Sequence, residues 1–428
     1  MSPTGDRPAA ANAGVLARIR PALTSLRPQR AGVVYALILL VVVLVIATAA
    51  KGQPAYLSSV NVSNILSQAA PDALLAVFMT VVLISGNFDL SVASVAALSA
   101  ALALKTLDSI GTAPAIILAL LVGAAVGLIN AALVQKIGVN AFIVTLGSMT
   151  AVRGIVLTAL NGQSVTAQSR SLVALDSTIY RVPVPVALVA GVLILTLAGL
   201  RIRQLSDAGT PPVDGFFIAL VLMGLAAIVV PVLAPALLTQ PLPVWLMLWV
   251  TVGVSVALRF LIGGRNLYAV GSNAEAARLS GINVDFYKMA PFVLSGAAAA
   301  GVGLLYAGRF NSVDPNALTG TELTVIAAAI LGGTSLFGGA GYVGKSVLGT
   351  VVLFTLSNGF NVLNLGSNYQ YVVQGAVLVA ASAVYTIASK SPARRAPKRR
   401  TSEPDVPASP PATGDTSAKS LHAAATKS

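Results

Sequence analysis

The sequence carries one apolar run after another, each about 20 residues long, and a helix of that length crosses a hydrocarbon core of about 30 Å. Only 10% of its 428 residues are charged, whereas soluble domains average about 25%. Membrane barrels alternate apolar and polar residues over about 10 positions, a pattern not seen here. We predict twelve spans, at 32–50, 64–86, 90–104, 114–134, 141–160, 184–200, 215–238, 243–261, 288–308, 321–333, 343–363 and 369–389. The predicted fold class is therefore an all-α polytopic membrane protein with about 12 transmembrane helices.

Positive charge is concentrated at the two ends of the chain and predicts both the domain limits and the orientation. The formal net charge is +13, of which residues 1–30 hold +4 and residues 390–428 hold +5. We predict a disordered cytoplasmic leader over 1–30, a transmembrane domain over 31–390, and a disordered basic cytoplasmic tail over 391–428. An even number of crossings places both termini on one side, here the cytoplasmic side of the inner membrane. A cleaved signal peptide is the competing interpretation of the first run, since Ala47-Thr48-Ala49 resembles a cleavage site.

Several kinds of chemistry are excluded by residues that the sequence lacks. There is no cysteine, and the single histidine, His422, lies in the polar tail. A thiolate site, a histidine general base and a histidine metal site are therefore excluded from the apolar region. The spans hold no cluster of acids, bases or metal ligands, so we predict a transporter that is not an enzyme, without metal or cofactor. The tails offer no aromatic residue for base stacking, which argues against a nucleic-acid partner.

A polar break interrupts the apolar sequence at Ser85–Ser91, where Asn87 and Asp89 follow a glycine. Charged residues inside a membrane are costly, so each is by default a functional candidate. One interpretation is a turn in which Asp89 and Ser91 cap the next helix. The other is a broken helix whose polar groups line a transport pathway. The two interpretations are compatible, and Asp89 is the main charged candidate in both.

A second break, Leu331–Tyr342, is rich in glycine, which permits sharp turns and close helix contacts. The glycines predicted to break the helix are Gly332, Gly333, Gly338 and Gly339. The triplet Gly344-Lys345-Ser346 resembles the end of a nucleotide-binding P-loop. A P-loop, however, joins a strand to a helix in a soluble sheet, and here apolar spans lie on both sides. We therefore predict no nucleotide-binding domain in this chain.

The longest polar stretch between the later spans is 262–287, which we predict to lie in the cytoplasm beside the membrane. Its centre contains good helix formers, with Asn273 able to cap the start and Gly281 able to end the helix. Glu275 and Arg278 suit the helix dipole and form an i,i+3 pair. The sequence therefore predicts a short helix between the two caps. A plain surface connector is the alternative.

Four segments of the chain resemble motifs of a known family and occur in the same order. They are SGNFDLSVASVAALSA, NAFIVTLGSMTAVRGIVLTALNGQSV, GRNLYAVGSNAEAARLSGIN and AAAILGGTSLFGGAGYVGKSVLGT. In these segments the chain resembles the membrane permease subunits of ribose/xylose-type ABC sugar importers. The resemblance implies a type II importer fold with broken helices, two cytoplasmic ATPase subunits and an external sugar-binding protein. It also implies two permease copies in the lipid bilayer, which we expect to be a homodimer.

The resemblance further implies roles for two groups of residues. The stretch 262–287 matches the segment that couples a permease to its ATPase, at Asn273, Glu275, Ala276, Ala277, Arg278 and Gly281. The first break matches a motif near the translocation pathway, at Asn87, Phe88, Asp89 and Ser91. Phe88 is bulkier than the family pattern. Residues 184–238 indicate an inserted helical hairpin, as in longer xylose-type members, which favours a pentose.

The resulting hypothesis is a passive pathway for a neutral monosaccharide such as xylose or ribose. Separate ATPase subunits would push the short cytoplasmic helix and so open the pathway to each side in turn. Two alternatives remain. A relative within the same superfamily would carry branched-chain amino acids or nucleosides. An ion-coupled secondary transporter would need a carboxylate within the membrane, for which Asp89 is the candidate.

Overall fold

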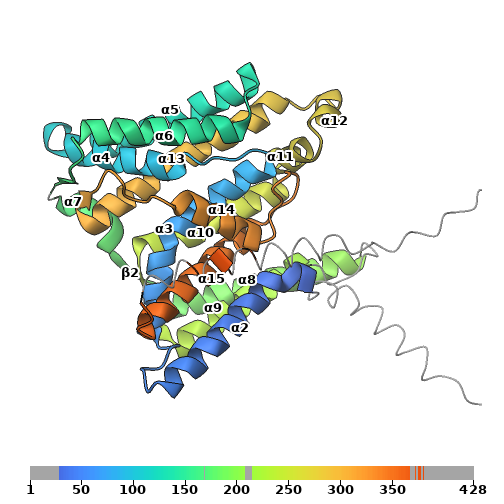
Figure 1. The fold of residues 1–428 in the computed structure, drawn as a ribbon. Coiled ribbons are helices and arrows are strands. Elements are labelled where there is room, and N and C mark those ends of the chain that lie inside the picture. Colours follow the sequence, from blue (N-terminus) through green and yellow to red (C-terminus); the bar gives the residue numbers. More distant parts are fainter. Residues whose placement is uncertain are drawn as a thin grey trace, which may run out of the picture. The chain divides into compact units, whose positions relative to one another are not determined.

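The computed structural model describes residues 28–167, 169–207 and 215–366, with isolated helical positions at 372, 375, 376 and 379. Every predicted span within these ranges is a helix (Figure 1). They are α2 (Pro28–Ala50), α3 (Ser59–Ile84), α4 (Val92–Ile110), α5 (Thr112–Ala132), α6 (Ala141–Ala159), α8 (Val184–Asp207), α9 (Gly215–Leu233), α10 (Leu242–Phe260), α13 (Val284–Phe310), α14 (Thr321–Leu331) and α15 (Val343–Val362). Of the twelfth predicted span, 369–389, only positions 372, 375, 376 and 379 are described. The predicted basic tail and the predicted leader up to 27 lie outside the described residues.

The helices differ in whether they are long enough to cross a membrane alone. Within the described residues, eight are long and apolar enough: α2, α3, α4, α5 with its final turn, α6, α10, α13 and α15. Helix α14 has 11 residues, which at 1.5 Å each gives about 16 Å, or half of the hydrocarbon core. The glycine-rich loop 332–342 follows it. The predicted interrupted helix is therefore confirmed.

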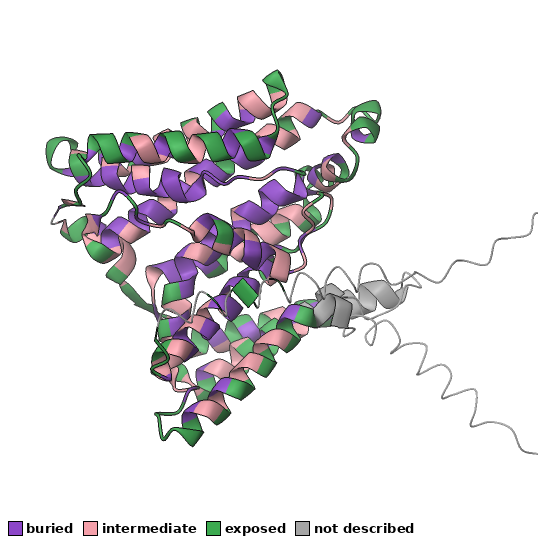
Figure 2. Cartoon of the chain, in the orientation of Figure 1, coloured by how far each residue is buried: buried purple, intermediate pink, exposed green. Residues whose placement is uncertain are grey.

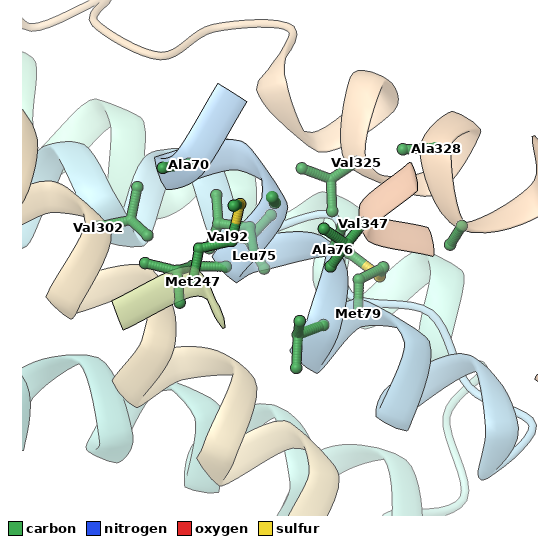
Figure 3. Close-up of a cluster of buried hydrophobic side chains, with 14 of the residues drawn as sticks. Ala70, Leu75, Ala76, Met79, Val92, Met247, Val302, Val325, Ala328 and Val347 are labelled. Atoms are coloured by element: carbon green, nitrogen blue, oxygen red, sulfur yellow. The ribbon is translucent and has the colours of Figure 1, made fainter. Parts of the chain in front are cut away.

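The core is built from α3, α4, α10, α13, α14 and α15, whose facing residues are buried (Figures 2 and 3). Its side chains are mostly small or β-branched and come from segments far apart in the sequence. Figure 3 labels Ala70, Leu75, Ala76, Met79, Val92, Met247, Val302, Val325, Ala328 and Val347. Because such side chains are short, the helix backbones can approach closely, which is the main source of helix association in a membrane.

Glycine allows the closest of these helix crossings. A Cβ on Gly123 of α5 would lie 2.5 Å from the carbonyl oxygen of Gly296 on α13, and a Cβ on Gly303 would lie 2.1 Å from that of Ala96. Both distances are shorter than any normal contact. Helix α13 therefore packs directly on the backbones of α4 and α5 and forms the centre of the bundle.

The outer faces of α2, α5, α6 and α10 carry exposed apolar side chains. Figure 2 shows the exposed residues along α2 and α6 in green. Such faces suit contact with lipid, which is as apolar as the side chains themselves. Helix α2 nevertheless packs on α15, where Leu44 lies against Gly359. Its described part starts at Pro28, within the predicted leader.

Short ribbons and helices connect the ends of the spans. Strand β1 (Val165–Thr166) pairs with β4 (Ser312–Val313), and β2 (Ile179–Arg181) pairs with β3 (Thr239–Pro241), both antiparallel. Helix α7 (Arg170–Ser177) packs on α13, and the 3₁₀ turn η2 (Pro235–Leu238) precedes β3. Helices α8 and α9 pack along each other and meet at Gly191 and Gly224.

Candidate functional site

The first sequence break is an extended segment between α3 and α4. Helix α3 ends at Ile84, α4 begins at Val92, and Gly86 between them has a φ of 83°. Asp89 lies in this segment and is 1% exposed. Its Oδ1 accepts hydrogen bonds from the backbone N–H of Ser91 at 3.1 Å and from the Ser91 hydroxyl at 2.6 Å. The carboxyl group therefore fixes the entry into α4.

A chain of buried hydrogen bonds extends from Asp89 into two further helices. Asn130 of α5 donates to the Ser91 hydroxyl at 3.0 Å, and its own Oδ1 accepts from the Ser148 hydroxyl of α6. The Ser295 hydroxyl of α13 lies beside the Asp89 carboxyl. Asp89 makes no ion pair with any described residue, and its Oδ2 lacks a hydrogen-bond partner. The hydrogen bonds thus join α4, α5 and α6 around a carboxyl group that has no cation partner among the described residues, and the nearby Ser295 hydroxyl of α13 makes no hydrogen bond.

The structure corrects part of the predicted cap at α4. Ser91 occupies the position before the helix, but its side chain caps no backbone N–H group. Asp89 supplies the acceptor instead, because the Ser91 hydroxyl is already committed to that carboxyl group. Asn87 is buried and donates to the Ser85 hydroxyl, while Phe88 packs against the core. Within this single chain, the predicted pathway residues are therefore packed among helices.

The second break forms a loop with left-handed glycines. Gly333, Gly338 and Gly339 have φ values of 84°, 84° and 70°, whereas Gly332 keeps a helical backbone at the end of α14. A Cβ on Gly332 would lie 2.6 Å from the backbone of α15. Phe337, near the tip, is 93% exposed. The sequence thus turns sharply at the predicted glycines.

Buried hydroxyl groups hold this loop against α3 and α15. The Thr80 hydroxyl of α3 donates to the Ser346 hydroxyl of α15 at 2.7 Å, and Thr334 of the loop lies 3.3 Å from the same oxygen. These three residues are at most 1% exposed. Because each hydroxyl finds a polar neighbour, the loop can lie deep in the protein without unpaired side-chain oxygens.

The predicted short helix is present as α12 (Ala274–Leu279), directly after α11 (Ile262–Ser272). The Asn273 side chain accepts from the backbone N–H of Ala276 at 3.0 Å, and Gly281 follows the helix with a φ of 80°. Both predicted caps are therefore confirmed. Leu279 at its end is 82% exposed.

The predicted ion pair between Glu275 and Arg278 is absent from the structure. Arg278 instead lies 4.0 Å from Asp285, in the first turn of α13. Asp285 also accepts from Gln135 at 2.8 Å and from Lys136 at 2.6 Å. Asp285 thus links α12 to the turn between α5 and α6.

The Asp285 cluster was not predicted from the sequence. Gln135 and Lys136 belong to η1 (Leu133–Ile137), a π-helical turn that extends α5. Turns of this kind are rare and often occur at functional sites.

Two arginines within the spans also have partners. Arg153 of α6 donates to the carbonyls of Pro315 and Ala317, and Arg309 of α13 pairs with Asp176 of α7 at 3.0 Å.

The two breaks and the end of α11 meet at one point, formed by Gly86, Gly271 and the pair Gly338–Gly339. We call these residues the glycine junction. A Cβ on Gly338 would lie 2.6 Å from the carbonyl oxygen of Gly271 and 2.9 Å from the Cα of Gly86. The segment that precedes α12 therefore touches both interrupted elements directly.

A bundle of this kind, with eight span-length helices among the described residues, one half-length helix that ends in a glycine loop, and a short capped helix at one end, is that of a multi-pass membrane protein. Residues 61–382 match the family model described as the branched-chain amino acid transport system / permease component. The chain therefore belongs to this family.

Its relatives are sugar permeases. The chain is 35% identical to the xylose transport system permease protein XylH of Escherichia coli (strain K12), over 76% of this chain and 85% of that protein. It is 32% identical to the ribose import permease protein RbsC of the same strain, over 80% and 91%. It is 31% identical to the D-allose transport system permease protein AlsC of that strain, over 78% and 86%.

No solved structure matches the chain. The relatives confirm the resemblance to ribose/xylose-type permeases, and they are named as permease proteins and not as enzymes. Permeases of ABC importers work with separate ATPase and binding-protein partners. Together with the apolar helices, the family confirms a multi-pass protein of the inner membrane.

Proposed function

We propose that this chain is the membrane permease subunit of an ATP-driven importer and forms the translocation pathway for a neutral monosaccharide. Family membership and a single structural observation support this proposal. The observation is that α12, a short exposed helix capped at both ends, directly follows a segment packed on both broken elements. A rigid surface helix in that place can pass an external push to the interior.

The substrate proposal comes from the relatives and from the chemistry of the spans. The three relatives described above are named for xylose, ribose and D-allose, all uncharged sugars. Among the described residues, the charged side chains of the spans are few, and Arg153 and Arg309 are already engaged by protein partners. A neutral polyol needs hydrogen-bonding groups but no counter-charge. We favour a pentose, and an external sugar-binding protein delivers it.

In the proposed mechanism, closure of two cytoplasmic ATPase subunits pushes on α12. The residues at this contact are Asn273, Glu275, Ala276, Ala277, Arg278 and Gly281. The displacement reaches the extended segment with Asn87, Phe88, Asp89 and Ser91, which forms part of the pathway wall. It also reaches the loop with Gly332, Gly333, Gly338 and Gly339. Movement of these two segments opens the pathway alternately to each side.

The end of the bundle that carries α12 is proposed to be cytoplasmic, with both termini on that side. Basic residues near α12 support this orientation, because cytoplasmic loops carry an excess of lysine and arginine. They are Lys136, Arg265, Arg278, Lys288 and Lys345.

A second permease copy is proposed to complete the pathway. The exposed face of α6 carries small residues at helical spacing, and a Cβ on Gly147 or Gly154 would meet nothing within 4 Å. Ala151 and Thr158 lie on the same exposed face. Small residues at such spacing let another helix approach closely within a membrane, so this face suits a homodimer contact.

The test compares two substitutions of Gly281 in the complete importer in proteoliposomes. Asparagine tolerates a left-handed backbone, whereas a β-branched residue does not. We expect Gly281→Val to abolish ATP-driven sugar uptake while the protein still inserts, and Gly281→Asn to retain most of it. The double substitution of Glu275 and Arg278 by alanine is expected to abolish sugar-stimulated ATP hydrolysis.

Normal uptake and normal stimulation of ATPase activity in the Gly281→Val variant would contradict this function. The ion-coupled alternative predicts a different result. In that case the chain alone would accumulate sugar under an ion gradient, without any ATPase subunit.

A further inference from the structure

The contact between α11 and the two breaks is made of backbone atoms. A Cβ on Gly271 would lie 1.7 Å from the carbonyl oxygen of Ile84, the last residue of α3. The same position is 2.8 Å from the backbone nitrogen of Gly339. That nitrogen donates a hydrogen bond to the Ile84 oxygen at 2.9 Å. No side chain separates α11, α3 and the glycine loop here.

Side chains around this point add further connections. The Tyr268 hydroxyl of α11 donates to the carbonyl oxygen of Gly341 at 2.8 Å. Leu267 of α11 packs in a buried cluster with Val81 and Ile84 of α3. Helix α11 is thus fixed to both neighbours over its last two turns, one residue before the Asn273 cap of α12.

We infer that the glycine junction acts as a rigid link, and that Gly271 is the positioning residue through which α12 moves both broken segments together. A contact of packed side chains can absorb a small displacement by changing rotamers, whereas touching backbones joined by a hydrogen bond cannot. Interiors this closely packed transmit strain. The segments before α4 and before α15 therefore shift together with α11. This inference rests on the proposed function.

The first test is Gly271→Ala, which places a methyl group where the Ile84 oxygen lies and forces the segments apart. The matched control is Gly344→Ala, because a Cβ there meets nothing within 4 Å. Both variants are reconstituted with their ATPase and sugar-binding protein. We expect Gly271→Ala to retain ATP hydrolysis but lose uptake, so that sugar moved per ATP falls, and the control to keep the wild-type ratio.

The second test asks whether the junction moves as one unit. The chain contains no cysteine, so a pair introduced as Ile84→Cys and Gly341→Cys has no competing thiol. A Cβ on Gly341 would lie 2.8 Å from Cγ1 of Ile84, which places the two β carbons within reach of a disulfide. We expect uptake by this variant to be equal before and after reduction of the disulfide.

Each outcome decides whether the junction moves as one rigid unit or opens during transport. If oxidation stops uptake and reduction restores it, the junction must open during transport and the inference is wrong. Failure of the pair to cross-link with a membrane-permeant oxidant, when each single cysteine reacts with a membrane-permeant thiol reagent, would mean that the segments do not touch, which also overturns it. Normal coupling in Gly271→Ala would do the same, provided that the wild-type complex shows ATP-driven uptake. Absence of that uptake in the wild type would instead reject the proposed function.

Discussion

Replacement of Asp89 separates a hydrogen-bonding role from a charge-carrying role for the main acidic residue beside α4. Asp89→Asn keeps an acceptor oxygen for both bonds from Ser91, and Asp89→Ala removes it. Asparagine cannot carry a proton or pair with a coupling ion. Asp89→Asn therefore removes only the charge, whereas Asp89→Ala removes both the charge and the hydrogen-bond acceptor.

The expected magnitudes follow from the bonds in the structure. Asp89→Ala removes two hydrogen bonds, at 3.1 and 2.6 Å, each with a net value of about 0.5–1.5 kcal/mol. It also leaves the buried backbone N–H of Ser91 without its acceptor, which adds about 1 kcal/mol or more. We expect Asp89→Ala to lower the free energy of unfolding by about 2–4 kcal/mol, and Asp89→Asn by less than about 1 kcal/mol.

The assay combines unfolding with SDS in mixed micelles and uptake by the complete importer. Asp89→Asn is expected to keep most of the uptake, and Asp89→Ala to lose it together with stability. A stable Asp89→Asn protein without uptake would show that the ionisable group is required. That result would refute the structural role of Asp89 and favour an ion-coupled carrier.

Two further predictions concern other parts of the bundle. Arg309→Met leaves the partly buried Asp176 carboxylate without its partner at 3.0 Å, and the cost lies between about 1 kcal/mol for an exposed pair and about 3–5 kcal/mol for a fully buried pair. We expect a loss of unfolding free energy within this range, and a loss below about 1 kcal/mol would show the pair to be unimportant. For the α6 contact, Ala151→Cys is expected to form cross-linked dimers in membranes, while Val256→Cys on the exposed face of α10 is not. Equal cross-linking at both positions would contradict a contact through α6.

Local sequence signals predicted much of this structure because they act over a few residues. Apolar runs located the spans, and the glycines after Leu331 marked where α14 stops. The caps of α12 were also predictable, since an asparagine side chain and a left-handed glycine act within one turn of the helix. In each case the physical cause lies next to its effect in the chain.

The rest depends on pairs of residues that are far apart in the sequence. Asp285 contacts Gln135 across 150 positions. The local sequence therefore could not show that Arg278 lies near Asp285 and not near Glu275. Gly271 occupies an ordinary position near the end of a helix. No side chain fits there because the carbonyl oxygen of Ile84, which is far away in the sequence, lies against it in the folded chain. The Ser91 hydroxyl looked like a helix cap because its commitment to Asp89 depends on the folded path of the loop.

The β2–β3 ribbon has a consequence for how this chain tolerates changes in length. Arg181 is paired with Thr239, so the segment that contains α8 and α9 begins and ends at neighbouring positions in the structure. Excision of 184–233, with a tight turn joining the two strands, would remove these two helices as a pair and leave β2 and β3 side by side. Asp89, the glycine junction and α12 would all keep their neighbours. The ribbon is thus a place at which the chain could lose or gain a helical pair while the contacts of Asp89, the glycine junction and α12 stay the same.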